Sequence, residues 1–198
     1  MQSFEIKNGQ RLISTLGNSP MGYAFPAAIG ASLALGKKSI ICIDGDGGFQ
    51  LNIQELQTVF NYQLPIKMFV INNRSMGIIK QFQDLYFDSR YIASSPAGGY
   101  TSPDFVKVAE AYGIKAVTIK QLDSAQEKIS EVLNNPGPIL CDVWIDEDQK
   151  INPKIEFGRP LEDMAPYLDR TEFMENMIVE ILPDSKEIPK HTGWVNLK

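Results

Sequence analysis

The sequence predicts an α/β fold, a doubly wound and mainly parallel sheet with helices on both faces. Four short apolar runs have the length of strands: residues 39–44, 66–71, 114–119 and 138–145. Their nearly continuous apolar character is typical of strands covered on both faces. Helical patterns with recognisable start and stop residues separate them, and such strand–helix alternation favours a parallel sheet.

The first two predicted helices follow from their end signals. Pro26 suits the first turn of a helix that Gly36 ends. Asn52, with Glu55 three residues later, resembles a capping box, and the apolar residues after it form one face. We therefore expect a helix from about residue 26 to 36 and another that begins near residue 52.

Of the next two predicted helices, one precedes the third strand and the other lies between the third and fourth strands. Ser102, followed by a proline, opens a helix that Gly113 ends. Ser124 and Glu127 open another, which ends in the Asn-Asn-Pro-Gly sequence at 134–137. These signals place one helix on each side of the third strand.

Two segments do not fit a compact strand–helix unit. Residues 84–101 are rich in serine, glycine and proline, and we expect a mobile loop that acts as a lid. The tail contains several prolines and one short helix near residues 172–181. We therefore divide the chain into a binding domain at residues 1–150 and a tail at residues 151–198, which wraps the domain, covers a site or is partly disordered.

Composition excludes several classes of function. Of 198 residues 43% are hydrophobic, and the net charge is −5 with a pI near 5.0, which argues against nucleic-acid binding. No apolar stretch reaches the roughly 20 residues that span a membrane, and no signal peptide is evident, so we expect a cytoplasmic protein. Cys42 and Cys141 fall in predicted strands and are interpreted as core residues, and His191 alone does not support a Ser-His-Asp site.

The most informative pair of residues is Asp46 and Asn73. Each follows a predicted strand directly, and open parallel sheets bind ligands at the carboxyl ends of their strands. A carboxylate, an amide oxygen and a nearby carbonyl suit the octahedral oxygen coordination of Mg²⁺. The glycines around Asp46 allow backbone N–H groups to approach a diphosphate. Taken alone, Gly-Asp-Gly is as consistent with an ordinary tight turn, and asparagines after a strand have the same alternative.

The spacing of this pair resembles that of a known family. Gly45-Asp46-Gly47, followed 27 residues after Asp46 by Asn73, is similar to the thiamine-diphosphate motif of the pyruvate decarboxylase and acetolactate synthase superfamily. Further segments that resemble acetolactate synthase lie at residues 21–31, 48–56, 73–82, 102–105 and 109–113. The resemblance covers about residues 11 to 145 and implies the thiamine-diphosphate-binding fold.

The resemblance implies a magnesium and a cofactor site. Asp46 and Asn73 would donate side-chain oxygens to Mg²⁺ and Ser75 its backbone carbonyl, while the backbone of Gly47 and Gly48 contacts the diphosphate. Met21 matches the apolar residue that wedges between the two rings of thiamine diphosphate and holds it bent. The remaining implied cofactor-binding residues are Ser19, whose carbonyl accepts from the aminopyrimidine, Ile78, on the reactive side of the pocket, and Gly45, Met76 and Gly77.

Several positions differ from the acetolactate synthase pattern. Gly48 stands where serine is frequent, and Asn18-Ser19-Pro20 replaces a Leu-Gly-Thr segment. Phe82 stands where a tryptophan usually helps to select the acceptor 2-oxo acid. The identity of the 2-oxo acid and its acceptor is therefore not inherited from the resemblance.

The resemblance further implies that this chain is the diphosphate-binding domain of a larger, homo-oligomeric decarboxylase or carboligase. The catalytic glutamate of the family lies on a pyrimidine-binding domain, in the same polypeptide or a partner subunit, so we expect no catalytic residue and no turnover in this chain alone. Two alternatives stay open. One is a simple decarboxylase or an oxidase with the same cofactor, and the other is a non-catalytic assembly module that keeps the fold.

Overall fold

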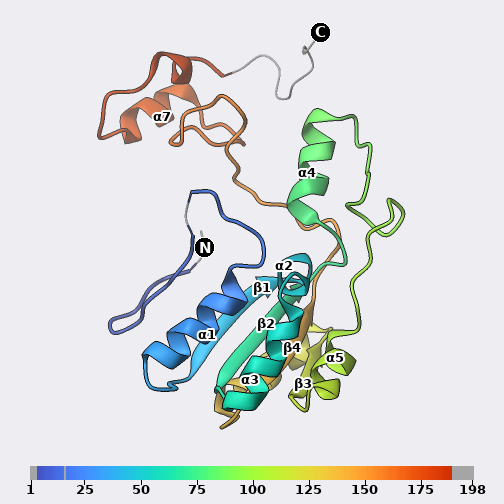
Figure 1. Ribbon diagram of the computed structural model, residues 1–198. Coiled ribbons are helices and arrows are strands. Elements are labelled where there is room, and N and C mark those ends of the chain that lie inside the picture. The colour runs from blue at the N-terminus through green and yellow to red at the C-terminus, as the bar shows by residue number, and fades with distance from the viewer. Residues whose placement is uncertain (1–3, 16, 189–198) are drawn as a thin grey trace. The chain divides into compact units, whose positions relative to one another are not determined.

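The computed structural model describes residues 4–15 and 17–188 and divides into two compact units (Figure 1). The sheet unit comprises residues up to Arg74 together with Ser102–Asp146. The second unit comprises Ser75–Thr101 together with the residues from Glu147 on. The boundary expected at residue 150 stays a prediction, but the segment 75–101 groups with the tail. Each unit is described below by itself.

Four parallel strands form the sheet in the described part of the chain. Their order is β1-β2-β4-β3, with bounds Ile40–Gly45 for β1, Ile66–Asn72 for β2, Ile139–Trp144 for β4 and Lys115–Ile119 for β3. All four strands lie within a residue or so of the predicted runs, and the predicted parallel α/β fold is confirmed. Gly45 is paired with Ile71, so the carboxyl ends of β1 and β2 meet at one edge of the sheet.

The helices of the sheet unit follow the strands in alternation. They are α1 at Ala24–Ala34, α2 at Asp46–Gln50, a short 3-10 helix at Ile53–Glu55, α3 at Leu56–Tyr62, α5 at Phe105–Ala111, a 3-10 helix at Leu122–Ser124 and α6 at Ala125–Asn134. In Figure 1, α1 runs beside β1, and α2 lies at the carboxyl ends of β1 and β2.

Two apolar clusters cover the two faces of the sheet. The larger one contains Met68 and Leu140 from the strands and joins them to Phe25 of α1 and Leu56 of α3. The smaller one contains Ile139 and Cys141, the sequence neighbours of Leu140 on the opposite face, packed against α6. Because successive strand residues point to opposite faces, these clusters confirm the doubly wound arrangement.

Lys67 is a charged residue that is buried within a strand. The side chain of Lys67 in β2 is only 2% exposed, and its ammonium donates to the carbonyls of Asn135 and Gly137 (2.7 Å to Gly137). Burial lowers the pKa of Lys67 below its usual value. The side chain thereby ties the loop between α6 and β4 to the middle of the sheet.

Several helix ends differ from the sequence predictions. The helix expected near Asn52 is preceded by α2, which begins at Asp46, and the Asn52 side chain makes no cap. The cap of α5 is Asp104, which accepts from the Lys107 amide, rather than Ser102. At α5 the Asp104 side chain supplies the hydrogen bond that the cap requires, whereas the Asn52 side chain donates to the Gly22 carbonyl instead of capping a helix.

The second unit holds a helix that the sequence analysis missed. α4 spans Gly77–Tyr86, which includes the first residues of the segment predicted as a loop. The remainder of that segment has backbone hydrogen bonds of its own, among them Tyr100 N to Ser95 O at 2.9 Å. The tail contains α7 at Arg170–Asn176, close to the predicted short helix, and a 3-10 helix at Pro183–Ser185.

Candidate functional site

The carboxyl ends of β1 and β2 place Asp46 and Asn73 at one edge of the sheet. Asp46 is the first residue of α2 and follows β1 directly, and its side chain is 2% exposed. Asn73 follows β2 directly. Since Gly45 is paired with Ile71, the two strands end beside each other, with a spacing of about 5 Å between them. Their roles as metal ligands stay predictions.

The two glycines Gly45 and Gly48 have different surroundings: the first is open and the second is packed against a side chain. Gly45 is extended, with φ −80° and ψ 161°, and a Cβ atom placed on it would meet no other atom within 4 Å. A Cβ atom on Gly48 would overlap Oδ1 of Asp44. The space of the serine that is frequent at position 48 is therefore taken by the Asp44 carboxylate.

The side chain of Asp44 forms a hydrogen bond with the backbone just before α2. Its Oδ1 accepts from the Gly45 amide at 2.9 Å, while Oδ2 is buried and has no hydrogen-bond partner among the described residues. Burial raises the pKa of the Asp44 carboxyl, and the hydrogen bond from Gly45 opposes that shift. An unpaired buried oxygen next to this glycine backbone is a feature that a bound cation or a hydrogen-bond donor would satisfy.

The donor chemistry of this edge fits magnesium and a diphosphate. Asp46 and Asn73, which follow β1 and β2, offer a carboxylate and an amide, both oxygen donors, and Mg²⁺ prefers oxygen ligands. Within residues 4–15 and 17–188 no group of three or more His, Cys, Asp or Glu side chains is arranged to hold a metal. The residues present therefore fit a hard cation that draws its other ligands from backbone, water and phosphate.

The loop that carries Met21 is tied to the segment after α2. Met21 is 48% exposed, and Ser19, also exposed, has a positive φ of 39°. The Asn52 side chain donates from Nδ2 to the Gly22 carbonyl at 2.7 Å. Sequence reasoning missed this role because Asn52 also matched a capping box, which is a local pattern with a competing explanation.

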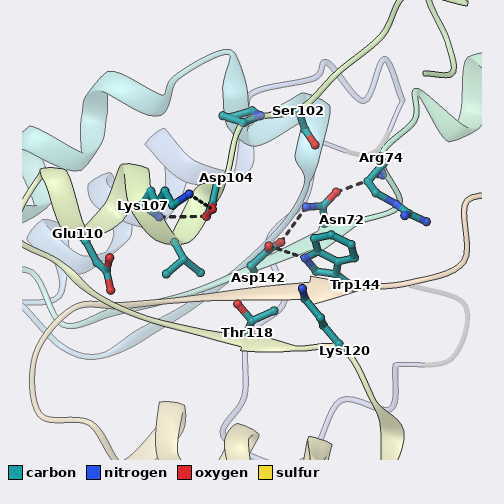
Figure 2. A pocket seen from close by; sticks show the side chains of 12 residues that line it. Asn72, Arg74, Ser102, Asp104, Lys107, Glu110, Thr118, Lys120, Asp142 and Trp144 are labelled. Carbon is teal, nitrogen blue, oxygen red and sulfur yellow. Dashed lines mark hydrogen bonds and ion pairs between the residues drawn. The ribbon is translucent and has the colours of Figure 1, made fainter. Parts of the chain in front are cut away.

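A buried hydrogen-bond network supports the turn that carries Asn73 (Figure 2). Asn72 donates from Nδ2 to Oδ1 of Asp142 at 2.9 Å, and the indole N–H of Trp144 donates to Oδ2 of Asp142 at 2.7 Å. Asn72 Oδ1 accepts from the Arg74 amide at 3.1 Å. Burial raises the pKa of Asp142, while the hydrogen bonds from Asn72 and Trp144 lower it. Asp142 lies in an apolar strand run, and its position there was the signal that the sequence analysis overlooked.

The same network borders a pocket of about 550 Å³ in the sheet unit. Figure 2 shows its polar lining, which is contributed by the ends of β2, β3 and β4 and by α5. The ammonium of Lys120 lies 4.1 Å from the centre of the Trp144 ring, and the Arg74 guanidinium lies 5.2 Å from it. Both cations lie near the Trp144 ring, while its indole N–H donates to Asp142.

The other predicted site residues belong to the second unit. Ser75 is buried, and its hydroxyl donates to the Glu147 carbonyl at 3.5 Å. The Met76 amide donates to the Ser94 carbonyl at 2.9 Å, so Met76 and Gly77 form the start of α4. Ile78, in the first turn of α4, is 59% exposed. The structure thus groups the predicted residues into one set in each unit.

Comparison with known proteins identifies the family. Residues 1–143 match the family model described as thiamine pyrophosphate enzyme, C-terminal TPP binding domain. The chain belongs to this family. The resemblance predicted from Asp46, Asn73 and their surroundings is therefore confirmed at the level of the family.

Curated relatives of the chain are acetolactate synthases. It is 42% identical over 147 residues to the acetolactate synthase large subunit of Pyropia yezoensis, covering 74% of this chain and 25% of that protein. It is 36% identical over 159 residues to the acetolactate synthase isozyme 2 large subunit of Escherichia coli (strain K12), covering 80% of this chain and 28% of that protein. The chain thus spans about a quarter of the length of these relatives.

A solved structure of the same fold is a decarboxylase. The thiamine diphosphate-dependent 4-hydroxybenzoylformate decarboxylase of Rhodococcus jostii RHA1 matches with a TM-score of 0.57 and 26% sequence identity. The match covers 66% of this chain and 24% of that one. This neighbour is a thiamine diphosphate-dependent enzyme, in agreement with the family of the chain.

The two cysteines add no second site to this family member. Cys42 and Cys141 are free and buried, as predicted, and burial raises the pKa of each thiol to about 12. Thiols with such a pKa are not reactive nucleophiles at neutral pH. His191 lies outside the described residues. No helix in the described part of the chain combines the length and apolar character needed to cross a membrane.

Proposed function

We propose that this chain is the diphosphate- and Mg²⁺-binding domain of a thiamine-diphosphate-dependent 2-oxo acid decarboxylase or carboligase of acetolactate synthase type. The observation that carries the proposal is the placement of Asp46 and Asn73 directly after two neighbouring parallel strands, at the same edge of the sheet. Family membership supports the cofactor. The metal, the carboligation reaction and the assembly are proposed here.

The metal site would be formed by three oxygens of this chain. Asp46 contributes its carboxylate, Asn73 its side-chain carbonyl and Ser75 its backbone carbonyl. The backbone N–H groups of Gly47 and Gly48 contact the diphosphate at the start of α2. The free positions around the cation are left to phosphate and water oxygens, as Mg²⁺ prefers.

The other predicted residues orient the organic part of the cofactor. Met21 wedges between its two rings, Ser19 accepts from the aminopyrimidine through its carbonyl, and Ile78 lines the reactive side. When bound, thiamine diphosphate supplies a carbanion centre that adds to a 2-oxo acid and takes up the electrons released with CO₂. The residues of this chain hold the two rings close to each other, which raises the rate through proximity.

A carboxylate from a pyrimidine-binding domain completes the proposed enzyme. That domain is provided by the same polypeptide or by a partner subunit of a homo-oligomer. The 198-residue chain by itself then binds the cofactor diphosphate and Mg²⁺ weakly and releases no CO₂ from a 2-oxo acid.

Calorimetry with thiamine diphosphate and Mg²⁺, in the presence of a separately supplied pyrimidine-binding domain, tests the proposal. Asp46→Ala removes a direct metal ligand and should weaken Mg²⁺-dependent binding by more than about 100-fold. Asp123→Ala, which removes an exposed carboxylate in the 3-10 helix before α6, serves as the matched control and should bind like the wild type. Equal binding by the wild type and Asp46→Ala, or no binding by the wild type, would sink the assignment.

A simple decarboxylase is a second candidate, favoured by the surroundings of Phe82. Its ring packs against Phe157, with ring centres 4.9 Å apart, and the ammonium of Lys154 lies 4.2 Å from its centre. A ring engaged by the tail in this way is less free to select an acceptor than an open tryptophan. Product analysis of the complete enzyme with pyruvate separates the two: acetolactate supports the carboligase and acetaldehyde the decarboxylase.

A further inference from the structure

The turn that carries Asn73 needs support from outside its own strand. Asn73 lies just after the end of β2, and the amide plane of a residue at such a position is not fixed by the sheet. Its neighbour Asn72 is 2% exposed, and both ends of its side-chain amide form hydrogen bonds within the protein. The side chain of Asn72 is therefore available to hold the turn.

Asn72 spans the turn through both ends of its amide. Oδ1 accepts from the Arg74 amide at 3.1 Å and closes a loop over Asn73, while Nδ2 donates to Asp142 at 2.9 Å. The backbone carbonyl of Asn72 also accepts from the Ile145 amide at 3.0 Å, which ties the end of β2 to the end of β4. Asn73 thus lies between Asn72 and Arg74, two residues that are joined by a hydrogen bond.

The polarity of this network is set by Asp142. An ionised carboxylate only accepts hydrogen bonds, so the amide of Asn72 must turn its NH₂ group toward Asp142 and its oxygen toward Arg74. The second carboxylate oxygen is engaged by the indole N–H of Trp144 at 2.7 Å, and an indole only donates. Two donors therefore face two acceptor atoms, and the opposite orientation of Asn72 would leave Arg74 without its acceptor.

We propose that Asp142 is a positioning residue, which fixes the Asn72–Arg74 turn and thereby presents Asn73 at the edge of the sheet. The functional part of this inference rests on the proposed role of Asn73 as a metal ligand. Asp142 touches neither metal nor cofactor, and it acts through Asn72. Trp144 has an auxiliary role, since it holds the carboxylate from the side opposite to Asn72.

Asp142→Asn tests the proposal with little change in volume. The new amide has a single oxygen, for which Asn72 and Trp144 both compete as donors, and its NH₂ group then faces one of them. Trp144→Phe alone removes one donor and leaves the Asn72–Asp142 hydrogen bond in place. In Asp142→Asn combined with Trp144→Phe, the competition is gone, and the single oxygen can again accept from Asn72.

Amide hydrogen exchange of the 198-residue chain, followed by NMR, is the deciding measurement. We expect the Arg74 amide to exchange at least tenfold faster in Asp142→Asn, to stay close to the wild type in Trp144→Phe, and to be largely restored in the double variant. The Val70 amide in the centre of β2 should not change, which separates a local effect from loss of the fold. A purely structural contribution of Asp142 does not predict rescue by removal of a second side chain.

Wild-type exchange at Arg74 in Asp142→Asn, or no recovery in the double variant, would overturn the inference. Mg²⁺ titration in the presence of thiamine diphosphate and the pyrimidine-binding domain is run on the same four proteins. Affinity should follow the exchange rates, with a loss of about 10- to 100-fold in Asp142→Asn, as for residues that orient metal ligands. If exchange behaves as expected but the wild type binds no Mg²⁺, the turn is fixed by Asp142 while the proposed function fails.

Discussion

The sheet unit and the tail of the second unit are stabilised by different interactions. In the sheet unit, Phe49 is buried between Phe25, stacked at 4.6 Å, and Phe105, edge-on at 5.9 Å. In the tail, the carboxylate of Asp163 is 1% exposed and pairs with two arginines, Arg159 and Arg170. One region is built on apolar packing and the other on a buried ion-pair cluster.

This difference determines how each region responds to the loss of one interaction. Apolar packing contributes through many small contacts, so the loss of one ring weakens the whole sheet unit. A buried ion pair balances large opposing terms, so the loss of one partner leaves an uncompensated charge. The guanidinium of Arg170 also lies 4.6 Å from the centre of the Phe173 ring, which is the buried side chain of α7.

The largest expected effect is that of Phe49→Ala. Loss of a fully buried ring should lower the free energy of unfolding by about 3–5 kcal/mol, because the transfer term and the cavity term add. Chemical denaturation followed by circular dichroism measures it. Leu161→Ala, at a position 77% exposed, is the control and should change little. A loss below about 1 kcal/mol for Phe49→Ala would contradict the view that apolar packing holds this unit.

Asp163→Asn should act on the tail alone. It keeps the shape of the side chain but leaves Arg159 and Arg170 without their charge partner, at a cost of up to about 3–5 kcal/mol within the tail. Hydrogen exchange of α7 should rise while the amides of β2 keep their protection. Glu162→Gln, an exposed neighbour, gives the baseline. Uniform loss of protection in both units would show that the two regions unfold together, and the comparison would fail.

The smallest effects come from two aspartates that cap short helices. Asp104 accepts from the Lys107 amide at the start of α5, and Asp169 accepts from the Thr171 amide at the start of α7. These backbone hydrogen bonds lower the pKa of each carboxyl. Asp104→Ala should destabilise the sheet unit by about 1 kcal/mol. In α7, which buries Phe173 alone, the same change at Asp169 should cause more local fraying.

The pH dependence of these caps has a defined sign. Because the folded pKa lies below the unfolded one, the stabilisation is complete above the unfolded value near about 4 and is lost as the pH falls through the folded pKa. Asparagine caps a helix without titrating, so Asp104→Asn and Asp169→Asn should flatten the acid limb of the stability curve. Thermal melts between pH 2 and pH 6 measure it, and an unchanged acid limb would exclude this origin.

The predictability of the two regions from sequence follows the same division. The strands of the sheet unit were predicted closely because Ile, Val and Met residues in short runs carry the burial pattern directly. The cluster around Asp163 has no period: its partners are four residues before it and seven after it in the chain, and charged residues are normally expected at the surface. Only the three-dimensional structure reveals it.

The site shows the same limit at the level of single residues. Asp46 and Asn73 were predicted because they stand at strand ends with a family-like spacing, a signal that needs no tertiary information. Asp142 and Asn52 act through side chains that reach across the sheet unit, over 70 and 30 positions in the chain respectively. Their role depends on which distant group each one faces, and a local pattern does not contain that.

The hydrogen bond between Asn52 and Gly22 joins two segments that are distant in the sequence. Gly22 has a φ of +82°, and a Cβ atom there would lie 2.8 Å from Nδ2 of Asn52 and 3.0 Å from Cβ of Leu51. A larger residue at position 22 would therefore approach both Asn52 and Leu51 too closely and would adopt a strained φ. The segment of Met21, which we propose contacts the cofactor rings, and the segment that follows Asp46, the proposed metal ligand, are joined by this hydrogen bond, so a substitution at Gly22 is expected to disturb both.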